Sequence, residues 1–182
     1  MLRWLENKLK FEINITMPYS HPSHREAIKQ FISDNFDPII QILDVGAGAG
    51  SYRDLLPNPI MDALEIYAKY IEDFDLKNKY RKVFNENAVS FKYKRHQLAI
   101  LGDVVQTLEI EDAKKIFTAL RKQGTAIIVQ VPFLYEQGPY DGNVNETHIQ
   151  ADLTNEVFLE RYAEFDFKLL TLDEVCGVYY IK

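Results

Sequence analysis

One ten-residue stretch, Gln41 to Gly50 (QILDVGAGAG), constrains the fold of this chain more than any other. Its first half is a short apolar run with a single acid, Asp44, and its second half places three glycines at alternate positions. An apolar run that ends directly in glycines is typical of a buried parallel strand that turns sharply toward a helix. Ligands of open α/β sheets bind beyond the carboxyl ends of such strands, where glycines permit positive φ and close approach. The stretch therefore predicts an α/β fold with a binding site at this turn.

The spacing of the glycines separates two classes of cofactor. The dinucleotide fingerprint G-x-G-x-x-G needs glycines at positions 46, 48 and 51, but position 51 is serine. The chain instead has the pattern acid-x-G-x-G-x-G, which resembles the first motif of class I S-adenosylmethionine (SAM)-dependent methyltransferases. The resemblance implies a Rossmann-like fold and SAM as the cofactor. It also implies that SAM is contacted by Asp44, Gly46, Ala47, Gly48 and Gly50.

A second acid follows the next predicted strand, residues 60–64. Glu65 stands 19 positions after Gly46 (65 − 46 = 19), close to where an acid accepts hydrogen bonds from ribose hydroxyls in this architecture. The two oxygens of a carboxylate suit the two donors of a ribose diol. We therefore expect Glu65 and its neighbour Ile66 to bind the ribose of SAM, with Asp62 as the alternative if the strand ends earlier.

The third predicted strand covers residues 80–84. In similar methyltransferases an acid after this strand accepts a hydrogen bond from the adenine amino group. The best match is Asn87 followed by Ala88, since an amide oxygen can still accept that bond, and Glu86 is the alternative.

The fourth predicted strand, residues 97–101, leads into a Gly-Asp-Val-Val segment that resembles the family motif G-D-V-x-E-H. Gln106 and Thr107 stand where that motif has Glu and His. Any acid/base role that Glu and His have in the family therefore cannot be carried over to this chain. The resemblance implies that Gly102 and Asp103 line the methionine end of SAM. Asp103 is also a candidate to orient an acceptor hydroxyl.

A polar, aromatic and glycine-rich segment, residues 132–152, follows the fifth predicted strand, residues 124–131. A loop of this length inside a compact domain more often serves a binding site than a simple connection. It resembles the acceptor-site loop of a subset of small methyltransferases. The resemblance implies acceptor contacts from Tyr135, Gln137, Tyr140, Asn143, Glu146 and His148.

His148 is the candidate general base, oriented by Glu146, because the pKa of histidine lies near neutrality. Together with Asp103 these two residues form the predicted catalytic set. The alternative is a self-packed loop in which Glu146 and His148 bond each other. A base is also dispensable if the donor and acceptor are held in near-attack geometry, since a sulfonium provides a good leaving group.

The whole chain, residues 1–182, is predicted to form one domain, with residues 1–37 as a helical lead-in. Strands at 165–170 and 175–181 complete a seven-stranded, mostly parallel sheet with helices on both faces and the last strand antiparallel. Ser23 and Glu26 have the spacing of a capping box for a helix that follows. His21 and His24 have ligand-like spacing, but no third ligand is near them in sequence, so no metal is expected.

Composition restricts the partners and the compartment. The net charge of −6, from 21 basic and 27 acidic residues, disfavours nucleic-acid binding through a general basic field. The single cysteine, Cys176, cannot form an internal disulfide, which favours a reducing, cytoplasmic setting. No apolar run suits a membrane span and no signal peptide is apparent. We expect a small-molecule acceptor and no membrane partner; the sequence leaves the oligomeric state open.

These patterns predict a SAM-dependent methyltransferase that acts on oxygen or nitrogen of a small or medium polar acceptor. Two alternatives remain. A non-catalytic SAM-binding module or partner subunit is suggested by Asn87, Gln106 and Thr107, which stand where the family is usually more acidic or basic. An NAD-dependent oxidoreductase is disfavoured by the glycine spacing.

Overall fold

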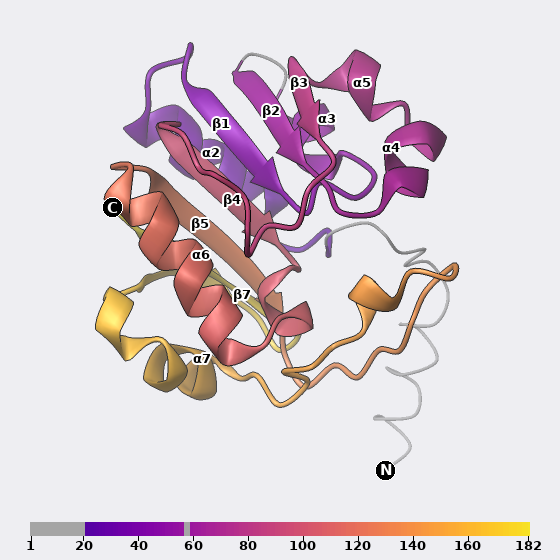
Figure 1. Cartoon of the computed structure of the whole chain (residues 1–182). Coiled ribbons are helices and arrows are strands. Elements are labelled where there is room, and N and C mark those ends of the chain that lie inside the picture. The colour runs from indigo at the N-terminus through magenta and orange to yellow at the C-terminus, as the bar shows by residue number, and fades with distance from the viewer. Residues whose placement is uncertain (1–20, 57–58) are drawn as a thin grey trace.

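A seven-stranded sheet with the order β3-β2-β1-β4-β5-β7-β6 is the centre of the fold (Figure 1). The computed structural model describes residues 21–56 and 59–182, so the first 20 residues of the predicted helical lead-in lie outside the described residues. The described strands are β1 (Gln41–Val45), β2 (Ile60–Leu64), β3 (Lys82–Phe84), β4 (Leu98–Gly102), β5 (Ala126–Pro132), β6 (Lys168–Leu172) and β7 (Cys176–Ile181). The described helices are α2 (Arg25–Asn35), α3 (Ser51–Leu55), α4 (Ala68–Asp73), α5 (Leu76–Lys79), η1 (Val105–Thr107), α6 (Ile110–Lys122), η2 (Val144–Glu146), α7 (Asn155–Arg161) and η3 (Ala163–Phe165).

Strands β1 to β5 are mutually parallel, and β7 inserts antiparallel between β5 and β6. The predicted fold class is therefore confirmed. The register aligns Val45 at the end of β1 with Leu64 of β2 and Leu101 of β4. Because the carboxyl ends of these strands share one edge of the sheet, the turns that follow them come together there.

Helices cover both faces of the sheet, as predicted. In Figure 1, α6 and α7 lie in front of the sheet and α2 lies behind it. Phe117 of α6 and Phe158 of α7 are fully buried in one apolar cluster, and Ile28 and Ile32 of α2 are buried in the other. Burying each such side chain contributes about 1.5–3 kcal/mol, so the two clusters hold the strands in place from both sides.

One local prediction was wrong. The capping box does not form, because α2 begins at Arg25 and its N-cap is His24, which has a left-handed backbone and no side-chain cap. Ser23 is therefore one position too early to cap the helix. Helices α4 and α5 are separate, because Asp75 between them has a left-handed backbone with φ 52°. Thr154 caps α7, with its hydroxyl accepting from the Val157 amide at 3.2 Å.

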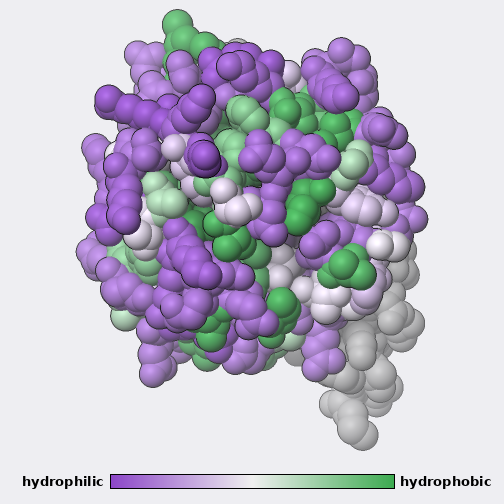
Figure 2. All heavy atoms as spheres, in the orientation of Figure 1, coloured by the Kyte–Doolittle hydropathy of each residue, from purple (hydrophilic) through white to green (hydrophobic). Residues whose placement is uncertain are grey.

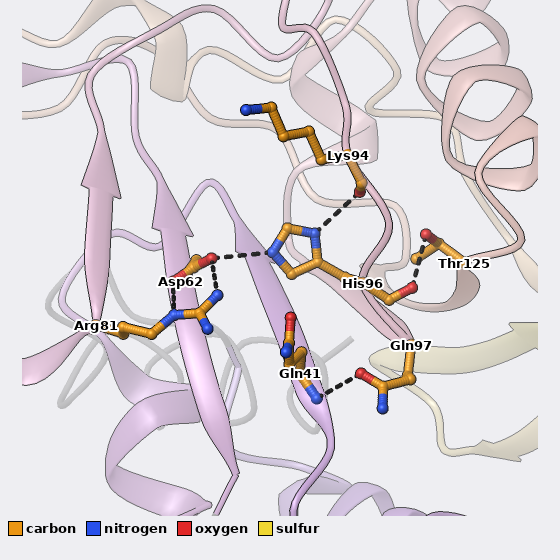
Figure 3. Close-up of polar contacts among 7 residues, drawn as sticks. All are labelled: Gln41, Asp62, Arg81, Lys94, His96, Gln97 and Thr125. Atoms are coloured by element: carbon orange, nitrogen blue, oxygen red, sulfur yellow. Dashed lines mark hydrogen bonds and ion pairs between the residues drawn. The ribbon is translucent and has the colours of Figure 1, made fainter.

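A polar network joins the strands away from their carboxyl edge (Figure 3). Asp62 of β2 accepts two hydrogen bonds from the Arg81 guanidinium, at 2.9 and 2.7 Å, and lies 3.1 Å from His96 Nε2. The Thr125 hydroxyl, just before β5, donates to the His96 carbonyl at 2.9 Å. Although burial alone would raise the pKa of Asp62, the bonds from Arg81 and His96 outweigh it and hold the pKa below its usual range. The network thus stabilises a buried carboxylate.

Figure 2 shows the surface of the molecule from the same side as Figure 1. This surface is mostly hydrophilic, with hydrophobic side chains in scattered patches. Among the residues that the structure describes, no helix has both the length and the apolar content needed to cross a membrane.

Candidate active site

A cavity of about 230 Å³ opens at the carboxyl edge of the sheet. Its wall is built from the turns after β1, β2, β3 and β4, the start of α6 and the loop around η2. The residues that line it are Val45, Gly46, Gly48, Leu64, Glu65, Ile66, Glu86, Asn87, Ala88, Val89, Gly102, Asp103, Val104, Thr107, Leu108, Glu109, Asp112, Asn143, Asn145, Glu146 and Ile149.

The glycine turn after β1 forms one side of this cavity. Gly46, Gly48 and Gly50 have φ values of 68°, 51° and 82°, a region that L-residues with side chains rarely occupy. A Cβ on Gly46 would lie 2.5 Å from Cγ2 of Val104, which itself lines the cavity. The turn can therefore lie tightly against the segment after β4 only with glycine at position 46.

Glu65 lies beside the glycine turn and is 4% exposed. Its Oε2 accepts from the Gly48 amide at 2.9 Å and its Oε1 from the Tyr67 amide at 2.8 Å. Burial raises the pKa of Glu65, while these amides favour the ionised form. Because each carboxylate oxygen has two lone pairs, both can still accept a hydroxyl from the cavity. The alternative, Asp62, is bound to Arg81 and does not line the cavity.

The segment after β3 forms the next part of the wall. Asn87 and Ala88 both line the cavity, as does Glu86. The side-chain oxygen of Asn87 already accepts from the Val89 amide at 2.8 Å, which closes a local turn. This oxygen therefore has only one lone pair left for a ligand. Glu86, the alternative predicted from the sequence, is the preceding residue. It is exposed, lines the same part of the cavity and has both carboxylate oxygens to offer a ligand.

Asp103, directly after β4, has a left-handed backbone with φ 56°. Its Oδ2 accepts from the His21 amide at 2.6 Å, whereas its Oδ1 is buried and makes no hydrogen bond within the described part of the chain. Burial raises the pKa of Asp103 to about 7. Gln130 of β5 also holds His21, by donating to its carbonyl at 2.9 Å. The segment before α2 is thus held against Asp103, which lines the cavity and keeps one unpaired carboxylate oxygen.

The loop after β5 contributes fewer residues to the wall than predicted. Asn143 and Glu146 line the cavity, but Tyr135, Gln137, Tyr140 and His148 do not. The predicted pair of Glu146 and His148 is not formed. Glu146 Oε1 instead accepts from the Asn143 amide group at 3.4 Å.

The His148 ring is held inside the protein. Its Nδ1 lies 2.7 Å from the Tyr135 carbonyl oxygen, and its Nε2 lies 3.4 Å from Nε2 of Gln106. Burial lowers the pKa of His148, which favours the neutral ring. The carbonyl of Gln106 accepts from the amides of Ile149 and Gln150 at 2.8 and 2.9 Å, so η1 anchors the end of the loop. His148 therefore supports the loop in this structure.

The structure brings most predicted cofactor residues into one wall. Those that line the cavity are Gly46, Gly48, Glu65, Ile66, Asn87, Ala88, Gly102 and Asp103, and those that do not are Asp44, Ala47 and Gly50. Sequence reasoning missed the residues of η1 and the start of α6. Their position directly after the Gly-Asp-Val-Val segment was the available signal, since any residue that follows β4 closely must lie near the same edge.

Comparison with known proteins is consistent with this geometry. No protein-family model matches the chain, and no curated protein sequence matches it. Solved structures do match. A SAM-dependent methyltransferase from Clostridium acetobutylicum ATCC 824 aligns with a TM-score of 0.67 and 11% identity over 98% of both chains.

Two further structures align in the same way. The glycopeptide N-methyltransferase MtfA, solved in complex with SAM, gives a TM-score of 0.63 and 11% identity over 92% of this chain and 98% of that one. The magnesium protoporphyrin IX methyltransferase ChlM from Synechocystis PCC 6803, solved with bound SAM, gives a TM-score of 0.59 and 11% identity over 86% of this chain and 78% of that one. The chain therefore has the Rossmann-like fold of class I methyltransferases.

Proposed function

We propose that this chain is a SAM-dependent methyltransferase that transfers a methyl group to oxygen or nitrogen of a small or medium polar acceptor. The single observation that carries the proposal is the position of Glu65. Its buried carboxylate lies in the cavity wall, is fixed by the Gly48 and Tyr67 amides, and keeps lone pairs for two hydroxyl donors. This is the chemistry that a ribose diol requires.

Other parts of the wall fit the remainder of SAM. Gly46 and Gly48 remove side chains from the turn, which leaves room for the ligand beside the backbone. The segment Glu86–Ala88 offers acceptors for an adenine amino group. The unpaired Oδ1 of Asp103 is suited to the ammonium group of the methionine moiety, because a buried carboxylate oxygen gains most from a charged donor.

SAM supplies an activated methyl group on a sulfonium sulfur. The task of the chain is then to hold the acceptor in line with that group and to exclude water. We assign the acceptor contacts to Asn143 and Glu146, which line the cavity from the loop around η2. Glu146 is the residue placed to accept a proton from an acceptor hydroxyl or amine. His148 positions the loop through Tyr135.

Calorimetric titration with S-adenosylhomocysteine tests the assignment, with NADH as the competing ligand. We expect micromolar affinity for S-adenosylhomocysteine, about −8 kcal/mol, and no NADH binding. Glu65→Gln should weaken binding about tenfold or more, because one of its oxygens becomes a donor. Glu72→Gln, at an exposed acid on α4, is the matched control and should bind like the wild type.

The other functions predict different outcomes. Tight NADH binding would instead support the alternative function of an NAD-dependent oxidoreductase. Binding of S-adenosylhomocysteine without methyl transfer to a broad panel of hydroxyl and amine acceptors would indicate a SAM-binding module. If Glu65→Gln binds as tightly as the wild type, the ribose assignment is wrong.

A further inference from the structure

Two pairs of metal-ligating side chains meet beside the start of α2. His21 and His24 precede this helix, whereas Asp173 lies in the turn between β6 and β7 and Cys176 is the first residue of β7. One ligand atom from each of His24, Asp173 and Cys176 lies within 4.8 Å of the other two. Nδ1 of His21 lies 3.9 Å from Sγ of Cys176. Two segments from distant parts of the chain thus place nitrogen, oxygen and sulfur donors around one point.

The surrounding residues orient these donors. Nδ1 of His24 lies 3.2 Å from the Thr171 hydroxyl, which leaves Nε2 facing Oδ2 of Asp173 at 3.3 Å. This Nε2 is buried and makes no hydrogen bond to any described residue. Oδ1 of Asp173 accepts from the amides of Val175 and Cys176, at 2.8 and 2.9 Å, while Oδ2 faces His24 and the Ser23 side chain also bonds this carboxylate. Metal-ligating histidines and carboxylates are characteristically held in this way by their second donor or acceptor.

We propose that His24, Asp173 and Cys176 bind a zinc ion, with His21 as the fourth ligand once its Nδ1 releases the Ser23 amide, from which it accepts at 3.2 Å. Zinc takes four ligands in a tetrahedron and accepts thiolate, imidazole and carboxylate together. D-x-x-C has the two-residue spacing of the C-x-x-C arms of structural zinc sites, whereas H-x-x-H is one residue shorter than their usual histidine arms. Magnesium and calcium do not suit the site, because they require oxygen ligands.

The ion would fasten the segment before α2 to the turn between β6 and β7. The same segment supplies the His21 amide that donates to Asp103 at the edge of the cavity. Zinc at this site therefore has a structural role next to the candidate active site. The inference stands on the cluster itself and does not depend on methyltransferase activity.

The test uses the full chain, purified without a histidine tag and stripped of metal with a chelator. Titration with zinc chloride should show a single high-affinity site per chain. Replacement of zinc by cobalt(II) should give a thiolate-to-cobalt charge-transfer band, which reports directly on Cys176. The metal content after gel filtration should confirm one retained ion.

Variants separate the ligands from their surroundings. His24→Asn and Asp173→Asn should each weaken zinc binding about a hundredfold, and Cys176→Ser should also abolish the charge-transfer band. Cys176 is buried, so Cys176→Ser could lose zinc binding simply by misfolding. Asp173→Asn keeps a side-chain oxygen for the two turn amides, so a loss of zinc binding in this variant reports on the ligand itself. Asp166→Asn is the control, because Asp166 is an exposed acid whose left-handed backbone suits asparagine.

Thermal unfolding gives a second readout. Zinc should raise the melting temperature of the wild type and of Asp166→Asn, and should leave that of His24→Asn unchanged. Failure of the wild type to bind zinc, or equal zinc binding by the wild type and all three ligand variants, would overturn the proposal. The cluster would then be a metal-free polar contact between α2 and the hairpin. Binding of S-adenosylhomocysteine is measured separately, so either proposal can fail without the other.

Discussion

The hydroxyl of Tyr80 donates to Oδ2 of Asp44 at 2.5 Å, directly beneath the glycine turn. Asp44 is 1% exposed and does not line the cavity. The Tyr80 ring also packs under the turn, where a Cβ on Gly50 would lie 3.4 Å from Cε2 of Tyr80. Asp44 therefore supports the turn through Tyr80, while the amides of Gly46, Gly48 and Gly50 are bound within the protein.

Removing the hydroxyl tests this support. Tyr80→Phe should lower the free energy of unfolding by about 1–3 kcal/mol, because a buried Asp44 carboxyl loses its hydrogen-bond donor. Urea denaturation of the single variants and of Tyr80→Phe combined with Asp44→Asn measures the coupling. Strictly additive losses would show that the two side chains do not depend on each other.

Asp44 also predicts a dependence of stability on pH. Burial raises the pKa of Asp44 from 3.8 to about 7, and the Tyr80 hydrogen bond only partly offsets this. The folded state then binds the proton more tightly than the unfolded state, so the stabilising contribution is complete below about pH 4 and is lost as pH rises toward 7. The slope within this window approaches about 1.4 kcal/mol per pH unit.

Urea denaturation of the wild type and Asp44→Asn across this range isolates the effect. The unfolding free energy of the wild type minus that of Asp44→Asn should fall steadily as pH rises from 4 to 7, and should level off outside this window. A constant difference would mean that Asp44 titrates at its ordinary pKa in the folded protein.

Gly46 is predicted to tolerate no side chain. Gly46→Ala should destabilise the protein by about 1–3 kcal/mol and abolish binding of S-adenosylhomocysteine, because φ is 68° and the new Cβ would meet Val104 at 2.5 Å. Gly138→Ala is the matched control: its φ is not positive and a Cβ there meets nothing within 4 Å. It should change stability by less than about 0.5 kcal/mol. Equal effects of the two substitutions would contradict the role of the turn.

The network in Figure 3 should affect stability without affecting ligand binding. Arg81→Gln removes the charge-assisted bonds to Asp62, which is 3% exposed, and leaves that carboxylate with His96. We expect a loss of about 2 kcal/mol in unfolding free energy, since the Arg81 side chain is 40% exposed and solvent screens part of the interaction. Calorimetry at a temperature where the variant is folded should give unchanged affinity for S-adenosylhomocysteine. Weaker binding would place the network in contact with the site.

Much of the fold could be predicted because its information is local. Apolar runs such as residues 41–45 and 126–131 form buried parallel strands, and the acid at position 65 follows its strand directly. How far along its strand a carboxylate lies was harder to predict. Asp44 aligns with Ala63 inside the sheet, two positions before the level of Glu65, so Asp44 stays buried within its strand whereas Glu65 follows its strand and reaches the cavity wall.

Contacts between distant segments could not be predicted at all. The histidines at 21 and 24 had no third ligand in their neighbourhood, and only the hairpin of β6 and β7 brings Asp173 and Cys176 to them. The interior position of the His148 ring has the same cause, because Gln106 and the Tyr135 carbonyl meet it only once the loop is folded.

The insertion of β7 between β5 and β6 has a consequence for biosynthesis. β7 is the last described strand along the chain, yet it occupies an interior position of the sheet. While residues 176–181 are still inside the ribosome, β5 presents an unpaired, apolar edge to the surroundings. Such an edge can pair with a strand of another nascent chain. Aggregation through the β5 edge is therefore favoured in the interval between the emergence of β5 and that of β7.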